Sequence, residues 1–208
     1  MRTRVLEGAV EALCVEGAAK IGADGIARRA GVSAAVVWEH FGGVEEVVAA
    51  AVEHVVRGRV RACGGELAGV RTVGELVRVG RSWCVVPDVG SVGWVVSQVS
   101  GSVVGERAVA AAVGVWSVAF ERVLVRVLAQ SPVQEFVDAA GLGRMVVAAL
   151  VGAQVGQGAG SVGAERALEA LEQVGELVSA LHVLGPESQR AVRIRLRHAG
   201  AARGVRQV

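Results

Sequence analysis

Large aromatic side chains, proline and cysteine are all scarce in this sequence of 208 residues. It has no tyrosine and three phenylalanines, so the four tryptophans are its main large rings. The three cysteines, Cys14, Cys63 and Cys84, are odd in number and far apart, which is typical neither of a disulfide framework nor of a zinc site. Glu7 and Glu11 interrupt the apolar residues at the N-terminus, so we predict no signal peptide and a cytoplasmic protein.

Sequence signatures of enzymes are also missing. The four histidines are scattered, and none lies at a catalytic spacing from a carboxylate. The sequence contains no nucleophile elbow, no HExxH and no phosphate-binding loop. We therefore expect no catalytic residues, no metal site, no cofactor and no enzymatic activity.

What the sequence does contain is apolar residues in helical patterns. Hydrophobic residues make up 52% of the chain, which is enough for a packed core. Beyond residue 61 no stretch alternates with the period of two that strands show, and the three prolines fall at the ends of apolar segments. The helices predicted there are 73–86, 89–100, 106–130, 137–156, 164–184 and 187–198.

One apolar stretch is long enough to cross a membrane. Residues 145–164 carry no charge. The stretch also contains Gln154, Gln157 and several glycines, and it breaks up near Gly158. We therefore interpret it as a buried helix that ends in a loop, and we expect no membrane partner.

A tight turn between two short helices is predicted in the segment 26–41, which reads IARRAGVSAAVVWEHF. Gly31 can take the positive φ angle that ends a helix, and the side-chain oxygen of Ser33 can accept a hydrogen bond from the next helix. That helix, residues 34–40, is short enough to lie in a major groove and turns Val37 inward. The pattern is typical of a helix-turn-helix that reads DNA.

This segment resembles the N-terminal domain of the tetracycline-repressor (TetR) family, and the resemblance covers residues 3–55. It rests on the I-A-x-x-A-G-V-S core, the H-F ending and the following helix EEVVAAAVEHVV. It implies an all-α protein: a three-helix DNA-binding domain in residues 1–45, a ligand-binding and dimerisation domain in 46–208, and a helix at about 44–63 that connects them. Double-stranded operator DNA is the implied partner. The residues expected to contact DNA are Arg28, Arg29, Ser33, Ala34, Ala35, Val36, Trp38, Glu39 and His40.

Several positions depart from the family pattern, and each departure removes a phosphate partner. Val36 and Trp38 stand where the family has Thr and Tyr. Val44 replaces a Lys, and Ile21 stands where a hydroxyl residue usually opens the second helix. Residues 1–61 carry eight basic and eight acidic groups, so no excess of positive charge attracts phosphates. The alternative is therefore a ligand-sensing pseudo-receptor with weakened or lost DNA binding. The basic residues that could compensate for the missing phosphate contacts are Arg2, Arg4, Arg28, Arg29 and His40.

The excess of positive charge lies instead at the C-terminus. Residues 187–208 contain six arginines against Glu187 alone. A run of like charges is typical of a solvated helix and tail, and we prefer that interpretation to a nucleic-acid contact.

Two pairs of side chains in the second domain are candidates for a ligand pocket. Trp94 and Gln98 are four residues apart on one predicted helix, and so are Trp116 and Phe120 on another. Each pair can line one wall of a mostly apolar cavity, to which Gln154 adds a polar group. The alternative is that these rings only fill a core of valine and alanine.

A narrower resemblance concerns the same region. The segments VWSVAFERVLVRVLAQ and ALEQVGELVSALHVLGPESQR are similar to the γ-butyrolactone autoregulator receptors, TetR-type repressors that sense small lactones in actinomycetes. In that family a tryptophan on the long ligand-domain helix lies in the pocket, and Trp116 matches it. The resemblance implies a repressor that a small hydrophobic ligand, such as a γ-butyrolactone, releases from DNA by a population shift. A helical interaction module without a ligand is the remaining alternative.

A homodimer is expected through the predicted helices 137–156 and 164–184. In TetR-like proteins the corresponding helices form a four-helix bundle across a two-fold axis. An apolar stripe on the second helix and small residues on the first would allow close contact, although the stripe could instead pack inside one subunit. The stripe is Leu168, Leu171, Val174 and Val178, and the small residues are Ala139, Ala140, Ala148, Ala149 and Gly152.

Overall fold

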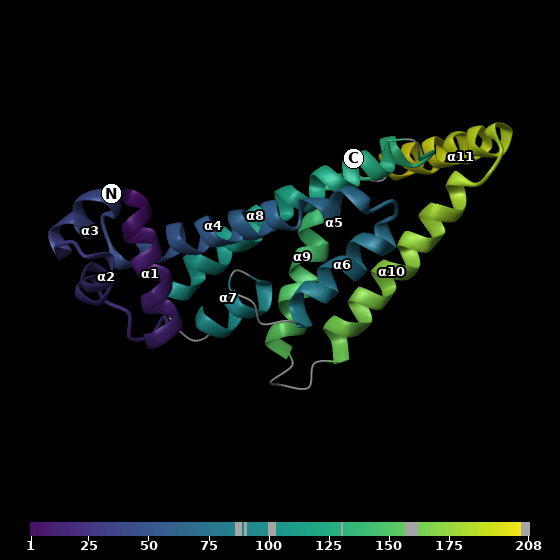
Figure 1. The fold of residues 1–208 in the computed structure, drawn as a ribbon. Helices are drawn as coiled ribbons and strands as arrows, with labels where there is room; N and C mark the ends of the chain where they lie inside the picture. The colour runs from purple at the N-terminus through teal and green to yellow at the C-terminus, as the bar shows by residue number, and fades with distance from the viewer. Residues whose placement is uncertain (86–88, 90, 100–102, 130, 157–161, 205–208) are drawn as a thin grey trace.

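The computed structural model describes residues 1–208 except 86–88, 90, 100–102, 130, 157–161 and 205–208. Its described residues contain helices and no strand, so the predicted all-α class is confirmed. The molecule is elongated, with three short helices at one end and the C-terminal helix at the other (Figure 1).

The three short helices form a small unit around one apolar core. They are α1 (Arg2–Glu16), α2 (Ala23–Ala30) and α3 (Ala34–Phe41). Val5, Leu13 and Ile26 are fully buried between them. Helices α1 and α2 pack closely at Gly8, where a Cβ atom would lie 2.8 Å from the backbone nitrogen of Ala30. We call this unit the head.

The helix α4 (Val44–Ala62) joins the head to the rest of the molecule. It packs against α1 at one end and runs alongside α8 (Val103–Leu128), with Val48, Val52 and Val56 buried (Figure 1). Helix α4 spans nearly the same residues as the helix predicted at about 44–63.

The larger unit, which we call the body, is a packed set of helices around α8. Its other elements are α5 (Gly64–Gly69), α6 (Val73–Val85), α7 (Val92–Val99), the 3-10 helix η1 (Gln134–Phe136), α9 (Ala139–Gly156), α10 (Val162–His182) and α11 (Pro186–Gly204). Each helix predicted from the sequence is found, with ends displaced by up to six residues. Helices α5 and η1 were not predicted, because one or two turns are too short to show periodicity.

Helix α8 is the centre of the body. By length and composition alone its residues Val104–Leu128 could cross a membrane. In the fold, however, Ala108, Trp116 and Leu124 are buried against neighbouring helices, as expected for a core helix. The uncharged stretch 145–164 falls partly in α9, which ends at Gly156, and residues 157–161 lie outside the described part.

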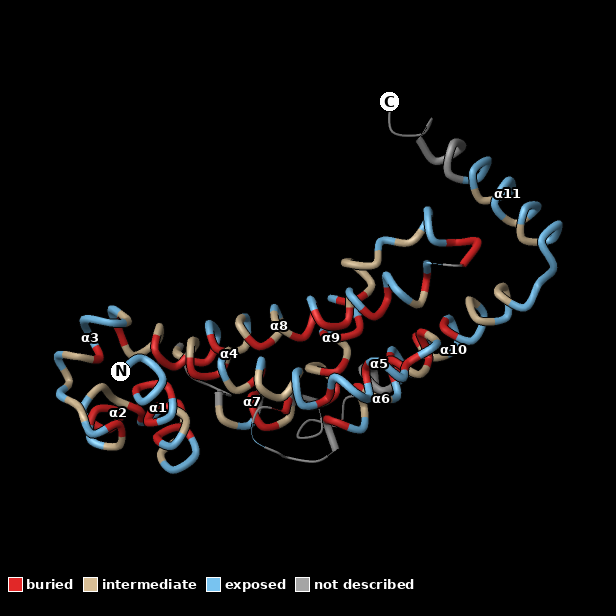
Figure 2. The backbone as a smooth tube through the Cα atoms, turned by 45° about the horizontal axis from the view of Figure 1, so that its top comes forward, coloured by how far each residue is buried: buried red, intermediate tan, exposed pale blue. Residues whose placement is uncertain are grey.

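The C-terminal helix α11 extends away from the other helices of the body (Figure 1). Most of its described residues are exposed (Figure 2). Arg197 pairs with both carboxylate oxygens of Glu135 at 3.0 and 3.1 Å. Arg190, Arg193 and Arg195 are exposed, as the prediction of a solvated final helix requires.

Candidate nucleic-acid interface and ligand pocket

The helix α3 lies at the surface of the head with one face exposed, as the sequence predicted. Of its eight residues only Val37 is buried, while Ala35, Glu39 and His40 are exposed. Trp38 has 52% of its surface exposed, which is a large fraction for an indole ring. The helix is therefore neither packed inside the molecule nor continuous with α2.

The turn before α3 is built by Gly31, whose φ of 64° lies in the left-handed region. Its backbone N–H donates to the carbonyl oxygen of Arg28 at 3.3 Å, and the N–H of Val32 donates to that of Ala27 at 3.0 Å. Ser33 occupies the N-cap of α3, but its side chain makes no capping hydrogen bond. The cap predicted for the Ser33 hydroxyl was therefore wrong, and Ser33 is exposed.

Two arginine side chains of α1 contact the C-terminal ends of α2 and α3. The Arg4 guanidinium donates to the carbonyl oxygens of Ala30 and Gly31 at 3.1 and 3.2 Å. These bonds give a donor to carbonyl groups that have no partner within the helix at the C-terminal end of α2. Arg2 lies 4.4 Å from the centre of the Phe41 ring and reaches the carbonyl oxygen of His40.

Arg28 and Arg29 differ although they are neighbours on α2. The Arg29 side chain is only 16% exposed, and its Nη1 lies 2.6 Å from Oε1 of Glu16. The same nitrogen donates to the carbonyl oxygen of Gly25. Arg28 is exposed. Of these two predicted DNA contacts, Arg28 is thus available to a phosphate, whereas Arg29 already neutralises a carboxylate.

Two sets of polar contacts join the head end of the molecule to the body. The backbone N–H of Ala18, in the loop after α1, donates to the carbonyl oxygen of Gln98 in α7 at 3.2 Å. Arg107 of α8 pairs with Glu45 at 3.5 Å and also with Glu46, in the first turn of α4. The loop after α1 and the start of α4 are therefore both tied to the body.

Three rings form the aromatic centre of the body. Trp116 is 1% exposed, and its ring centre lies 4.9 Å from that of Trp83 and 6.0 Å from that of Phe120. The sequence did not indicate Trp83, although it lies in a predicted helix. Its Nε1–H donates to the carboxylate of Glu66 at 2.8 Å. The two tryptophans differ in this respect, because Trp116 Nε1 is buried and has no hydrogen-bond partner among the described residues.

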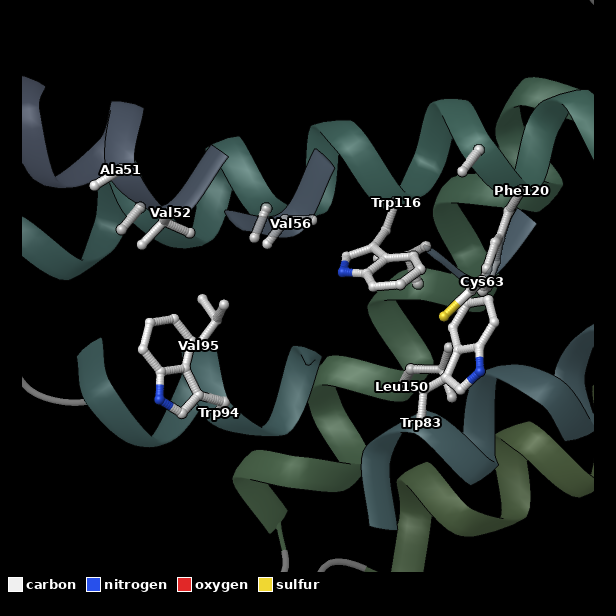
Figure 3. Close-up of a cluster of buried hydrophobic side chains, with 14 of the residues drawn as sticks. Ala51, Val52, Val56, Cys63, Trp83, Trp94, Val95, Trp116, Phe120 and Leu150 are labelled. Carbon is white, nitrogen blue, oxygen red and sulfur yellow. The ribbon is translucent and has the colours of Figure 1, made fainter. Parts of the chain in front are cut away.

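The unpartnered nitrogen belongs to a residue that lines a small apolar cavity. The nitrogen lies on the side of the Trp116 ring turned away from Phe120 and Trp83 (Figure 3). The cavity measures about 10 Å³, room for at most one water molecule. The other side chains around it contain no hydrogen-bond acceptor. They are Val95, Val109, Ala112, Val113, Val147 and Val151.

The five residues predicted to bind a ligand do not all meet at this cavity. Trp116 lines it, and Phe120 is buried beside Trp116. Trp94 is buried on α7, next to the cavity-lining Val95. Gln98 and Gln154 are half-buried.

Burial raises the pKa of the nearby Cys63 thiol, so this cysteine stays protonated near neutral pH and is a poor nucleophile.

The helices predicted to form a dimer present a mixed surface. Leu168 and Leu171 are buried within the subunit and Val178 is half-buried against the same core, so most of the stripe packs inside it. Val174 is 50% exposed and Leu177, also on α10, is 68% exposed. Met145 of α9 is exposed as well. Some apolar side chains of α9 and α10 therefore remain exposed in the single chain.

Comparison with known proteins identifies the fold. No family model and no curated protein matches the sequence. A structure assigned to the TetR-family transcriptional regulators, from Rhodococcus sp., is 18% identical with a TM-score of 0.58, over 85% of this chain and 97% of that one. The transcriptional regulator FadR from Bacillus subtilis, in complex with stearoyl-CoA, is 12% identical with a TM-score of 0.54, over 88% and 100%. A transcriptional regulator from Pseudomonas aeruginosa PAO1 is 18% identical with a TM-score of 0.52, over 87% and 91%. The chain therefore has the all-helical fold of TetR-family transcriptional regulators.

Proposed function

We propose that this chain is a DNA-binding transcriptional regulator of the TetR family, and that it is a repressor which a small hydrophobic ligand releases from operator DNA. The observation that carries the proposal is the exposed face of α3 at the surface of the head, with Val37 as its buried anchor. A short exposed helix after a tight turn fits the major groove. Trp38, Glu39 and His40 are the large side chains it offers to base edges and phosphates.

A homodimer would present two such helices to DNA. Two recognition helices about 34–36 Å apart contact successive turns of one face of the duplex. The exposed Met145, Val174 and Leu177 on α9 and α10 support this assembly, because a two-fold axis there would cover apolar surface on both copies. The operator is then a palindrome.

The ligand is proposed to bind at Trp116. The buried Nε1–H has no acceptor in the part of the chain that the structure describes, and leaving a buried donor unpaired costs about 1–3 kcal/mol. A ligand that brings a carbonyl oxygen into this apolar site would satisfy the donor. A γ-butyrolactone combines such an oxygen with an apolar tail, and the complex of the Bacillus subtilis regulator with stearoyl-CoA supports a hydrophobic ligand for this fold.

Ligand entry requires α7, α8 and α9 to move apart, because a cavity of about 10 Å³ is far smaller than a lactone. Helix α7 carries both Val95, which lines the cavity, and Gln98, whose carbonyl oxygen holds the Ala18 N–H of the head. A displaced α7 would release that bond and let the head turn with α4. The ligand acts through the difference in its affinity for the two states.

The test begins with selection of bound fragments from random-sequence DNA, followed by fluorescence anisotropy at 50 mM and 200 mM salt. We expect a palindromic site whose affinity falls with salt and with a synthetic γ-butyrolactone. Trp38→Ala should weaken binding, whereas Val125→Ala, an equally exposed position on α8, should not. Failure to bind any sequence at 50 mM salt would make the chain a ligand-sensing pseudo-receptor, and lactone turnover would make it an enzyme.

A further inference from the structure

A surface groove runs between α4 and α8, on the opposite side of α8 from Trp116. Its volume of about 560 Å³ falls in the range of small-molecule sites. Gly114, Val118 and Arg122 line it from α8 at four-residue intervals, which places them on one face of that helix. The groove shares no lining residue with the cavity at Trp116, so the two are separate.

The floor of the groove is formed by small apolar residues. Val60 of α4 and Val118 of α8 contribute to it. A Cβ atom built on Gly114 would meet no atom within 4 Å, so the space above this residue is open. On α4 the lining extends from Glu53 to Arg61, about 12 Å at 1.5 Å per residue. On α8 the lining extends from Ala110 to Arg122, about 18 Å by the same rise, so the groove is elongated along both helices and suits a linear chain better than a compact ring system.

Three arginines border this floor, namely Arg57, Arg61 and Arg122. The carboxylate of Glu53 accepts a hydrogen bond of 2.9 Å from Nε of Arg57, and it therefore neutralises the positive charge of Arg57. Arg61 and Arg122 are exposed and form no ion pair with any residue that the structure describes. Two guanidinium groups are therefore free to bind carboxylate or phosphate oxygens beside an apolar surface.

We propose that this groove binds a single-chain amphiphile with an anionic head: the carboxylate or phosphate lies on Arg61 and Arg122, and the acyl or alkyl chain lies on Gly114 and Val118. The bound chain would contact both α4 and α8 and hold them together. Binding in this groove requires neither the site at Trp116 nor DNA binding.

Equilibrium dialysis with decanoate, decyl phosphate and the uncharged decanol tests the site, each probe being kept below its aggregation limit. We expect saturable binding of at least one anionic probe, with decanol at least tenfold weaker. The preferred head shows whether the natural ligand is a carboxylate or a phosphate. Arg61→Gln and Arg122→Gln should each weaken binding about tenfold, and 0.5 M salt should weaken it further.

Gly114→Leu fills the groove with a side chain that meets open space, so it should fold normally and reduce binding at least tenfold. Gly58→Leu is the matched control, because Gly58 of α4 also faces open space but does not line the groove. Trp116→Phe should leave decanoate binding unchanged, which separates this site from the proposed lactone site.

Three results would overturn the proposal. The first is the absence of saturable binding of both anionic probes to the unmodified protein. The second is equal binding by the Gly114→Leu and Gly58→Leu variants, which would place the ligand elsewhere. The third is a change of oligomeric state in Gly114→Leu alone, which would identify the groove as a contact between copies of the chain.

Discussion

The backbone N–H of Ala18 and the carbonyl oxygen of Gln98 form a 3.2 Å hydrogen bond between the head and α7. Gln98 lies three residues after Val95, which lines the cavity at Trp116. One short helix therefore contacts both the proposed ligand site and the unit that carries α3.

If this contact transmits ligand binding, the Ala18 amide should exchange hydrogen faster when a synthetic γ-butyrolactone saturates the protein. Loss of the acceptor exposes the amide to solvent, and hydrogen-exchange mass spectrometry of a peptide spanning residues 15–22 measures it. Trp116→Phe should show no such change. Unaltered exchange despite release of DNA would place the coupling in α4 instead.

Trp116→Phe and Trp83→Phe remove the same ring volume, but within the described part of the chain only Trp83→Phe removes a hydrogen bond. Trp83 loses a donor paired with the Glu66 carboxylate, whereas Trp116 loses a donor that has no partner among the described residues. We expect the free energy of unfolding to fall by about 1–2 kcal/mol more in Trp83→Phe than in Trp116→Phe. Urea unfolding measures this difference. Equal losses would mean that Trp116 Nε1 is satisfied in solution.

Arg28 and Arg29 should affect DNA binding differently. Arg28→Ala removes an exposed charge, so the slope of log K against log salt should become shallower by about 0.9. Arg29→Ala breaks the pair with Glu16 and should lower the melting temperature with little change in slope. Anisotropy titrations over a range of salt concentrations distinguish the two, and an unchanged slope in Arg28→Ala would exclude this phosphate contact.

Gly8→Ala should loosen the head. The added methyl would lie 2.8 Å from the Ala30 backbone nitrogen and 3.0 Å from the Ile26 carbonyl oxygen, neither of which can move alone. We expect a loss of about 1–3 kcal/mol in unfolding free energy, together with weaker operator binding. Gly58→Ala, in open space on α4, should be neutral or slightly stabilising. Thermal unfolding followed by circular dichroism compares them, and equal melting temperatures would contradict the close packing of α1 on α2.

Leu177→Glu should convert the proposed dimer to a monomer, because it places a charge in the exposed apolar surface of α10. Val183→Glu is the control, since Val183 follows the end of α10 and is largely exposed. Size-exclusion chromatography with light scattering gives the mass of each variant. A Leu177→Glu dimer would place the interface on another surface.

Local signals explain why the head could be predicted so closely. Gly31 lies where a left-handed residue ends α2, and the apolar spacing turns Val37 inward, so neighbouring residues alone define the turn and the exposed helix. The Ser33 cap failed because the sequence identifies a residue able to cap but not where its hydroxyl points.

Contacts between residues far apart in the chain could not be predicted from the sequence. Trp83 and Trp116 are 33 positions apart, and only the packing of α6 on α8 brings their rings together. The pairing of Arg29 with Glu16 likewise depends on how α1 meets α2.

The sequence by itself determined the all-α class, the helix-turn-helix and the order of the long helices, because these follow from periodicity and from glycine and proline at helix ends. Only the tertiary structure decided which tryptophan keeps an unpaired donor, which arginines are free, and that Leu168 is buried while Leu177 is exposed. The physical reason is that burial and pairing depend on the surfaces that helices present to one another, and residues far apart in the chain build those surfaces.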